Sequence, residues 1–141
     1  MDVILNSKHN YFKEYIKNLQ LSDSNGNINI IIPKKNDWIE IVSRNKDVVI
    51  ILDAHSDEPY SACSSITCLD KLWQQGLNNP VIILGWLTLD YLNKSLSADI
   101  SCYLSASFYK DSYKYLRLPI TTESFLAHIH DVKPLNPKYH E

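Results

Sequence analysis

Glycine is scarce in this sequence. Only three of the 141 residues are glycine (Gly26, Gly76 and Gly85), and they lie far apart in the chain. Loops that cradle nucleotide phosphates need several glycines at short spacing, because the backbone itself must approach the phosphate. The sequence therefore lacks the signatures of dinucleotide-binding enzymes and of nucleoside triphosphatases.

Cysteine is also rare. The chain has three cysteines, Cys63, Cys68 and Cys102, an odd number without a C-x-x-C pair. A small disulfide-stapled domain has an even number of cysteines, and a zinc finger has paired ligands at short spacing. We expect three reduced, partly buried thiols, and from them a cytoplasmic protein.

Long apolar runs and an excess of one charge are missing as well. No apolar run approaches the roughly 20 residues of a membrane-spanning helix, and the first residues lack the apolar region of a secretory signal. Lys and Arg number 14 and Asp and Glu 16, for a net charge of −2. We expect no membrane partner and no direct contact with nucleic acid from this segment.

What the chain does contain is a regular alternation of short apolar runs and amphipathic stretches. Strands are expected at 3–5, 28–32, 47–53, 81–85 and 115–118, and helices at 11–19, 37–42, 66–73, 88–96 and 121–129. The segment 98–113 is assigned no element. This order predicts an α/β fold, a doubly wound three-layer α/β/α sandwich with about five parallel strands. Residues 1–133 are expected to form one domain, and 134–141 a tail or the start of a linker.

In such a sheet, ligands bind beyond the carboxyl ends of the strands. Three segments at expected strand ends indicate which protein family the chain resembles. An aspartate, Asp53, closes the run 48–53, a proline leads the run 79–85, and the run 115–120 ends in Leu118-Pro119-Ile120. In this order and spacing the chain resembles the receiver domain of bacterial response regulators. The resemblance implies a flavodoxin-like, receiver-like topology with Asp53 at the phosphoacceptor position.

The receiver family also implies three further groups around the phosphoacceptor. These are an acidic pair that helps to hold Mg²⁺, a hydroxyl on the fourth strand and a lysine on the fifth. Here Ser7 and Lys8 lie where the acidic pair is expected, Gly85 where the hydroxyl is expected, and Leu118 where the lysine is expected. The chain therefore resembles a degenerate receiver, or pseudo-receiver.

From this resemblance we expect a non-enzymatic signalling or scaffolding module that acts by protein–protein contact, with no metal and no cofactor. One hypothesis is that Lys8 approaches Asp53 and supplies the positive charge that a metal would bring. The first alternative is a receiver phosphorylated on Asp53 in a two-component system, which would require Mg²⁺.

Aromatic residues gather around the expected fourth helix and fifth strand. They form a candidate partner surface, because tyrosine and tryptophan combine a large apolar body with a polar tip. The set is Trp86, Tyr91, Tyr103, Tyr109 and Tyr115. The partner would be a signalling protein or effector domain, or a second copy in a homodimer through that helix and strand. It stays open whether these residues instead pack the 98–113 segment onto the sheet.

The segment 53–57 supports a second alternative. Its sequence, Asp53-Ala54-His55-Ser56-Asp57, resembles the Asp-Ala-His-x-Asp metal motif of the arginase-like ureohydrolases. The resemblance implies a small metal-dependent hydrolase in which Asp53, His55 and Asp57 hold metals that activate water. No second aspartate cluster follows in the sequence, and the chain has about half the length that such an enzyme needs.

Overall fold

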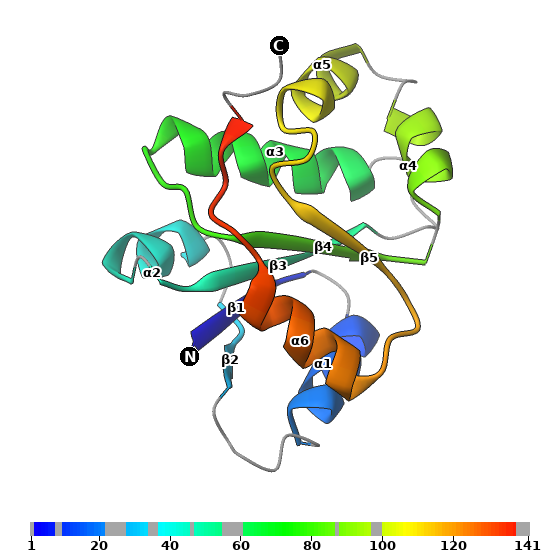
Figure 1. The fold of residues 1–141 in the computed structure, drawn as a ribbon. Coiled ribbons are helices and arrows are strands. Elements are labelled where there is room, and N and C mark those ends of the chain that lie inside the picture. The colour runs from blue at the N-terminus through cyan, green and yellow to red at the C-terminus, as the bar shows by residue number, and fades with distance from the viewer. Residues whose placement is uncertain are drawn as a thin grey trace.

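The structure is a computed structural model that describes residues 2–7, 10–21, 28–33, 37–45, 47–54, 61–86, 88–96 and 100–137. In these residues one five-stranded parallel sheet has the order β2-β1-β3-β4-β5 (Figure 1). The strands are β1 (Asp2–Asn6), β2 (Asn29–Ile31), β3 (Val49–Ala54), β4 (Val81–Gly85) and β5 (Lys114–Arg117). This is the flavodoxin-like, receiver-like strand order, so the predicted doubly wound α/β fold is confirmed.

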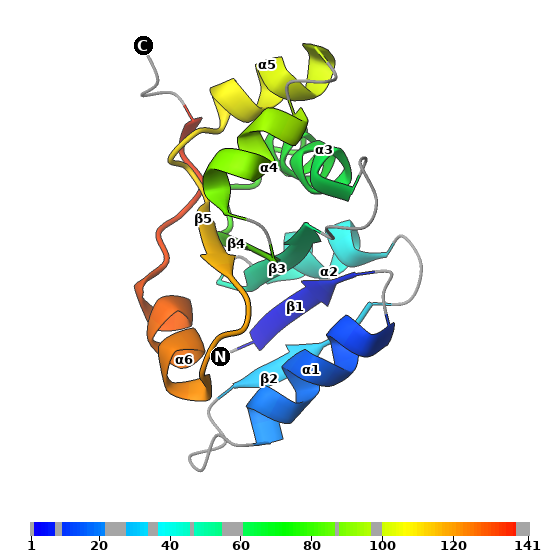
Figure 2. The same cartoon turned by 90° about the vertical axis from the view of Figure 1, so that its right-hand side faces the viewer.

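Helices cover both faces of the sheet. They are α1 (Asn10–Leu21), α2 (Trp38–Arg44), α3 (Ser61–Gln74), α4 (Leu89–Leu96), α5 (Ile100–Phe108) and α6 (Thr122–Asp131). Helices α1 and α6 lie on one face, and α2 and α3 on the other with α4 and α5 beside them (Figures 1 and 2). Thr121 caps the amino-terminal end of α6, because its side-chain oxygen accepts a hydrogen bond of 3.1 Å from the backbone N–H of Ser124.

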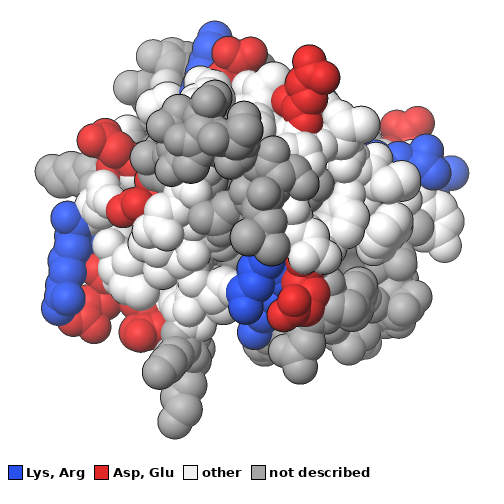
Figure 3. Space-filling view, turned by 90° about the horizontal axis from the view of Figure 1, so that it is seen from below, with Lys and Arg blue, Asp and Glu red and all other residues white. Residues whose placement is uncertain are grey.

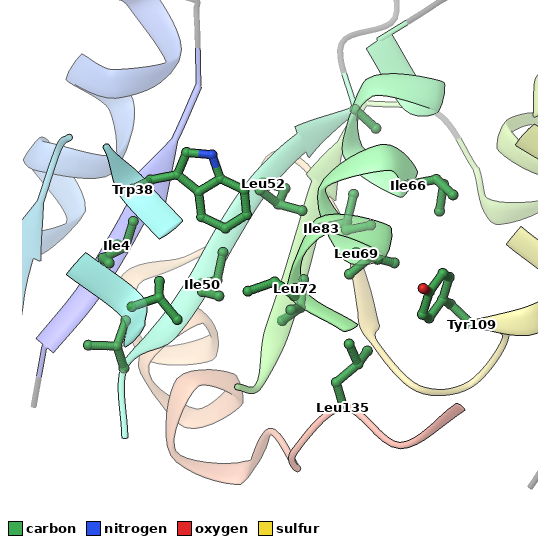
Figure 4. Packing of buried hydrophobic residues seen from close by; sticks show 14 of the residues in the cluster. Ile4, Trp38, Ile50, Leu52, Ile66, Leu69, Leu72, Ile83, Tyr109 and Leu135 are labelled. Carbon is green, nitrogen blue, oxygen red and sulfur yellow. The ribbon is translucent and has the colours of Figure 1, made fainter. Parts of the chain in front are cut away.

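Each face of the sheet has its own hydrophobic core. On one face, strand residues pack against Phe12 and Ile16 of α1 and against Phe125 and Ile129 of α6. On the other face, they pack against α2 and α3 (Figure 4). The central strands β3 and β4 are buried on both faces, which explains their continuous apolar sequences.

Helix α5 is the element that the sequence did not reveal. It contacts α3 and α4 (Figure 2). The Ser105 hydroxyl on α5 donates a hydrogen bond of 3.2 Å to Oδ2 of Asp70 on α3. The next residue after the helix, Tyr109, is buried beside the α3 leucines (Figure 4). These contacts fix a helix that itself has no buried residue.

The residues after α6 pack against the domain as far as the structure describes them. Leu135 is 1% exposed and belongs to the core on the α3 face. Its backbone N–H donates a hydrogen bond of 2.9 Å to the carbonyl of Asn78. Leu135 thus packs in the core although it lies in the segment 134–141 that was expected to be a tail or linker, and the domain boundary at 133 stays a prediction.

The cysteines differ from expectation. Cys102 on α5 is disulfide-bonded, whereas Cys68 on α3 is in no disulfide. The prediction of three reduced thiols is therefore wrong, and the cytoplasmic location inferred from it stays a prediction. Within the described residues, no helix combines the length and the apolar character that crossing a bilayer requires.

Candidate functional site

The carboxyl ends of the parallel strands meet at one edge of the sheet, and Asp53 lies there near the end of β3. In the strand register, Ala54 pairs with Gly85 of β4, and Gly85 pairs with Arg117 of β5. Ser7 follows β1 directly. The structure thus brings Asp53, Ser7 and Gly85 to the same edge, as expected for ends of neighbouring parallel strands.

Hydrogen bonds from serines hold Asp53. The Ser7 hydroxyl donates to Oδ2 of the Asp53 side chain at 3.0 Å, and both side chains are half-buried. The hydroxyl of the buried Ser65 on α3 donates to the Asp53 backbone carbonyl at 2.6 Å. The Asp53 carboxylate thus accepts a hydrogen bond from the residue that follows β1, and its backbone carbonyl accepts one from α3.

The described residues at this edge do not match the ligand set that Mg²⁺ prefers. That ion favours several oxygen ligands, among them more than one carboxylate in a receiver-like site. After β1 stand Asn6, whose side-chain amide donates to Sγ of Cys68 at 3.6 Å, and Ser7, which donates to Asp53. Among the described residues, no group of three or more His, Cys, Asp and Glu side chains could hold a metal ion.

Gly85 of β4 stands where the receiver family has a hydroxyl, and the space beside it is occupied by Tyr115 of the neighbouring strand β5. An ideal Cβ built on Gly85 would lie 2.5 Å from the Tyr115 hydroxyl oxygen and 2.9 Å from the backbone carbonyl oxygen of Ala54. Both distances are too short for any side chain. A side chain at this point of β4 would require the backbone carbonyl of Ala54 to shift, and the Tyr115 side chain of β5 would have to move its hydroxyl aside.

The end of β5 carries no charge into the site. Leu118 is 3% exposed and packs in the core on the α1 and α6 face. Its backbone N–H donates to the Gly85 carbonyl at 2.7 Å, which continues the ladder beyond β5. The neighbouring Arg117 is exposed, and its Nε donates to the Trp86 carbonyl at 3.2 Å. Strand alternation therefore directs the two side chains to opposite faces.

Several predicted site residues lie outside the described part of the chain. They are Lys8, His55 and Asp57. The hypothesis of a Lys8 charge beside Asp53 and the hydrolase alternative accordingly stay predictions. A cavity of about 830 Å³ opens at the amino-terminal end of β5, and its lining includes none of Ser7, Asp53, Gly85 and Leu118.

The aromatic residues divide between surface and core. Trp86, Tyr91 and Tyr103 are 38%, 58% and 49% exposed, and Tyr115 is half-buried. Tyr109, expected on the partner surface, is instead only 2% exposed, because its ring fills the core against α3 and its hydroxyl is hydrogen-bonded to Asp70. Tyr109 therefore packs in the core, and a partner surface formed by the exposed members of this set stays a prediction.

Burial also affects the acidity of these phenols. It raises the pKa of Tyr109 well above the ordinary tyrosine value, and the hydrogen bond to Asp70 and the charge of Asp70 raise it further. Burial is likewise the main cause of the raised pKa of Tyr113, with Asp111 adding to it. For Tyr115, burial raises the pKa and the nearby Arg117 partly opposes this.

Helix α5 carries three apolar residues on its surface, of which Ile100 and Leu104 were not anticipated from the sequence. Ile100, Leu104 and Phe108 of α5 are 76%, 62% and 45% exposed. Their spacing of four residues is the signal that could have located them, because it places them on one face of a helix. A cavity of about 360 Å³ lies beside this face, with Leu89, Tyr103, Lys110 and Tyr115 among its lining residues.

Acidic and basic side chains of the described residues lie beside one another on the face that carries α1 and α6. Figure 3, which views the molecule from below, shows them in mixed groups with other, white side chains between them. Two of the ion pairs are local pairs within helices, Lys17 with Glu14 and Arg44 with Glu40. Such exposed pairs contribute little to stability.

Comparisons with known proteins support the fold alone. No protein-family model matches the chain, and no curated protein matches it. Among solved structures, a putative CpaE2 pilus assembly protein from Sinorhizobium meliloti 1021 is similar, with a TM-score of 0.52 and 13% sequence identity. The match covers 92% of this chain and 98% of that chain. At this identity the shared property is the α/β fold over almost the full length of both.

Proposed function

We propose that this chain is a receiver-like module that acts by protein–protein contact and is not phosphorylated on Asp53 by a Mg²⁺-dependent reaction. One observation carries the proposal. The space beside Gly85, where a receiver needs a hydroxyl, is filled by the side chain of Tyr115. The module therefore has a fixed arrangement at the point where a receiver changes state.

The surroundings of Asp53 support the first half of the proposal. Transfer of a phosphoryl group to a carboxylate requires positive charge that neutralises the three equatorial oxygens in the transition state. The described neighbours of Asp53 supply hydroxyl groups from Ser7 and Ser65. Leu118, at the position where the family has a lysine, is a buried aliphatic side chain.

The surface of α4 and α5 supports the second half. Exposed aromatic side chains are enriched at contacts between proteins. Tyr91 on α4 and Tyr103 on α5 are about half exposed, and Trp86 lies just before α4. The similar solved structure is described as a pilus assembly protein, a description that names assembly rather than catalysis. A signalling protein or effector domain is the kind of partner that fits a receiver-like module.

Treatment with acetyl phosphate and Mg²⁺ tests this function. We expect that intact-mass spectrometry detects no added phosphoryl group, because the described residues include no group of three or more His, Cys, Asp and Glu side chains that could hold the metal. Asp53→Asn is the matched control, since it keeps the shape of the side chain and removes the nucleophile. A phosphoryl adduct on the wild-type protein that is lost in Asp53→Asn would instead establish the phosphorylatable receiver.

A further inference from the structure

Helix α5 gains little stability from its own packing. It lies on the outer side of α3, away from the sheet (Figures 1 and 2). No residue of the helix is buried, and the half-buried residues that face α3 are the small Cys102, Ser105 and Ala106. Small side chains remove little apolar surface from water. Tyr109, which follows the helix, is buried and anchors its carboxyl-terminal end.

A covalent bond supplements these contacts. Cys102 is disulfide-bonded, and Cys68 is in no disulfide. The chain has one other cysteine, Cys63, near the beginning of α3. A disulfide within the chain must therefore join Cys102 to Cys63, and so join α5 to α3.

The spacing of residues along α3 leads to the same pairing independently. Asp70 marks the side of α3 that faces α5, because its Oδ2 accepts a hydrogen bond of 3.2 Å from the Ser105 hydroxyl. Cys63 stands about two helical turns before Asp70, which returns to the same side of the helix. Cys68 stands on nearly the opposite side, and its Sγ accepts a hydrogen bond of 3.6 Å from the side-chain amide of Asn6 on β1. Of the two α3 cysteines, the helical spacing therefore places Cys63 toward α5.

The place of the bond makes it reducible. Cys102 is half-buried, on a helix at the outside of the molecule (Figure 2). Disulfides that a thiolate can reach exchange readily and include the regulatory ones. The cytoplasmic location predicted from the sequence is a reducing one, in which the disulfides that form are mostly transient or redox-sensing.

We propose that Cys63 and Cys102 form a reversible disulfide that locks α5 onto α3, and that a dithiol reductant releases the helix. A thiolate of the dithiol attacks one sulfur of the bond and forms a mixed disulfide, which frees the other cysteine. The second thiol of the reductant then attacks the reductant's own sulfur in the mixed disulfide and frees the first cysteine. The dithiol ends as a disulfide, and its two electrons and two protons leave both cysteines as thiols.

Reduction is expected to open α5 locally. Without the bond, the amino-terminal half of the helix keeps only weak contacts, such as the hydrogen bond between Ser105 and Asp70. Tyr109 stays in the core and limits the opening to the residues before it. The switch acts on α5 and not on Asp53, so it goes beyond the proposed function.

Counting thiols in the full chain tests the bond. The chain is purified without reductant, unfolded in denaturant and alkylated with iodoacetamide. Intact-mass spectrometry should find one labelled thiol before treatment with dithiothreitol and all three cysteines labelled after it. Peptide mapping without reduction should find Cys63 linked to Cys102 of the same chain. Three labelled thiols before treatment, a bond to Cys68 or a bond between two chains would each overturn the proposal.

Limited proteolysis tests the release of α5. Chymotrypsin cleaves after large apolar and aromatic residues, and Tyr103, Leu104 and Phe108 of α5 are exposed. Dithiothreitol should accelerate cleavage at these residues on the order of tenfold or more, because a helix must open locally before a protease can cut it. Cleavage at Phe12, in the core beneath α1, should stay slow.

Two cysteine variants connect the release to the bond. Cys102→Ala should be cut in α5 as fast as the reduced wild-type chain, with or without dithiothreitol. Cys68→Ala is the matched control, because it removes a thiol of α3 and leaves the bond, and it should respond to dithiothreitol as the wild type does. Equal cleavage of α5 in the oxidised and reduced wild-type chains would overturn the proposal. So would loss of protection at Phe12 upon reduction, since it would show global unfolding. None of these results decides the phosphorylation of Asp53, which tests the proposed function separately.

Discussion

Gly85→Thr is expected to destabilise the protein by about 2–3 kcal/mol, at the upper end for overpacked sites. The introduced Cβ would lie 2.9 Å from the carbonyl oxygen of Ala54, which belongs to the neighbouring strand and cannot move without disturbing the sheet. It would also lie 2.5 Å from the hydroxyl oxygen of Tyr115. Urea unfolding, followed by the midpoint at an unchanged m-value, measures the loss.

A double-variant cycle separates the two contacts. Tyr115→Phe removes the hydroxyl, so Gly85→Ala combined with Tyr115→Phe should lose less stability than the two single changes together. A remainder should persist, because Ala54 still crowds the new Cβ and the nearest ring carbon stays at 3.2 Å. If Gly85→Thr were as stable as wild type, Tyr115 could leave this space freely, and the fixed arrangement in the proposed function would be wrong.

Tyr109→Ala should cost about 3–5 kcal/mol, as for other large buried aromatic side chains. Tyr109 is 2% exposed and joins the end of α5 to the α3 core. Tyr109→Phe should cost only about 1–2 kcal/mol, because it keeps the ring and removes the hydrogen bond to Asp70. Tyr103→Ala, at a site 49% exposed, is the control and should stay within about 0.5 kcal/mol at a protein concentration low enough to keep the chain monomeric.

The pH dependence of the same variant gives a second readout. The raised pKa of Tyr109 means that its phenol stays protonated in the folded chain after it ionises in the unfolded chain. Its contribution is therefore fully present below about pH 10 and is lost as the pH rises above it, by up to about 1.4 kcal/mol per pH unit. Tyr109→Phe should show a shallower decline, and Tyr113 and Tyr115 should account for part of the rest. Identical slopes above pH 10 would contradict the assignment.

The fold could be predicted from the sequence because strands that are buried on both faces of a sheet have continuous apolar sequences. Strands β3 and β4 carry such runs, and their alternation with amphipathic stretches predicts the parallel sheet. Helix α5 was not accessible in this way. Its inward face consists of small residues such as Ser105 and Ala106, so the periodic pattern points to solvent instead of the core. A search for large apolar residues on a buried helix face therefore misses this helix and assigns its residues to a loop.

The sequence predicted part of the candidate site. The place of Asp53 at the end of β3 follows from strand order, and Gly85 marks a position without a hydroxyl. The contact between Ser7 and Asp53 was not predictable, because a neutral serine after β1 carries no sign of what it binds. Nor does the sequence show that Tyr115 fills the space beside Gly85, since this depends on the rotamer of a side chain from another strand.

The most direct measurement is an amide NMR titration of the wild-type chain with Mg²⁺ and then with beryllofluoride, which mimics an aspartyl phosphate. If the proposed function is correct, the signals of Asp53, Gly85 and Leu118 do not shift in a saturable manner. Saturable shifts that begin at Asp53 and spread to Gly85 and Leu118 would show a working phosphorylation switch and would contradict it.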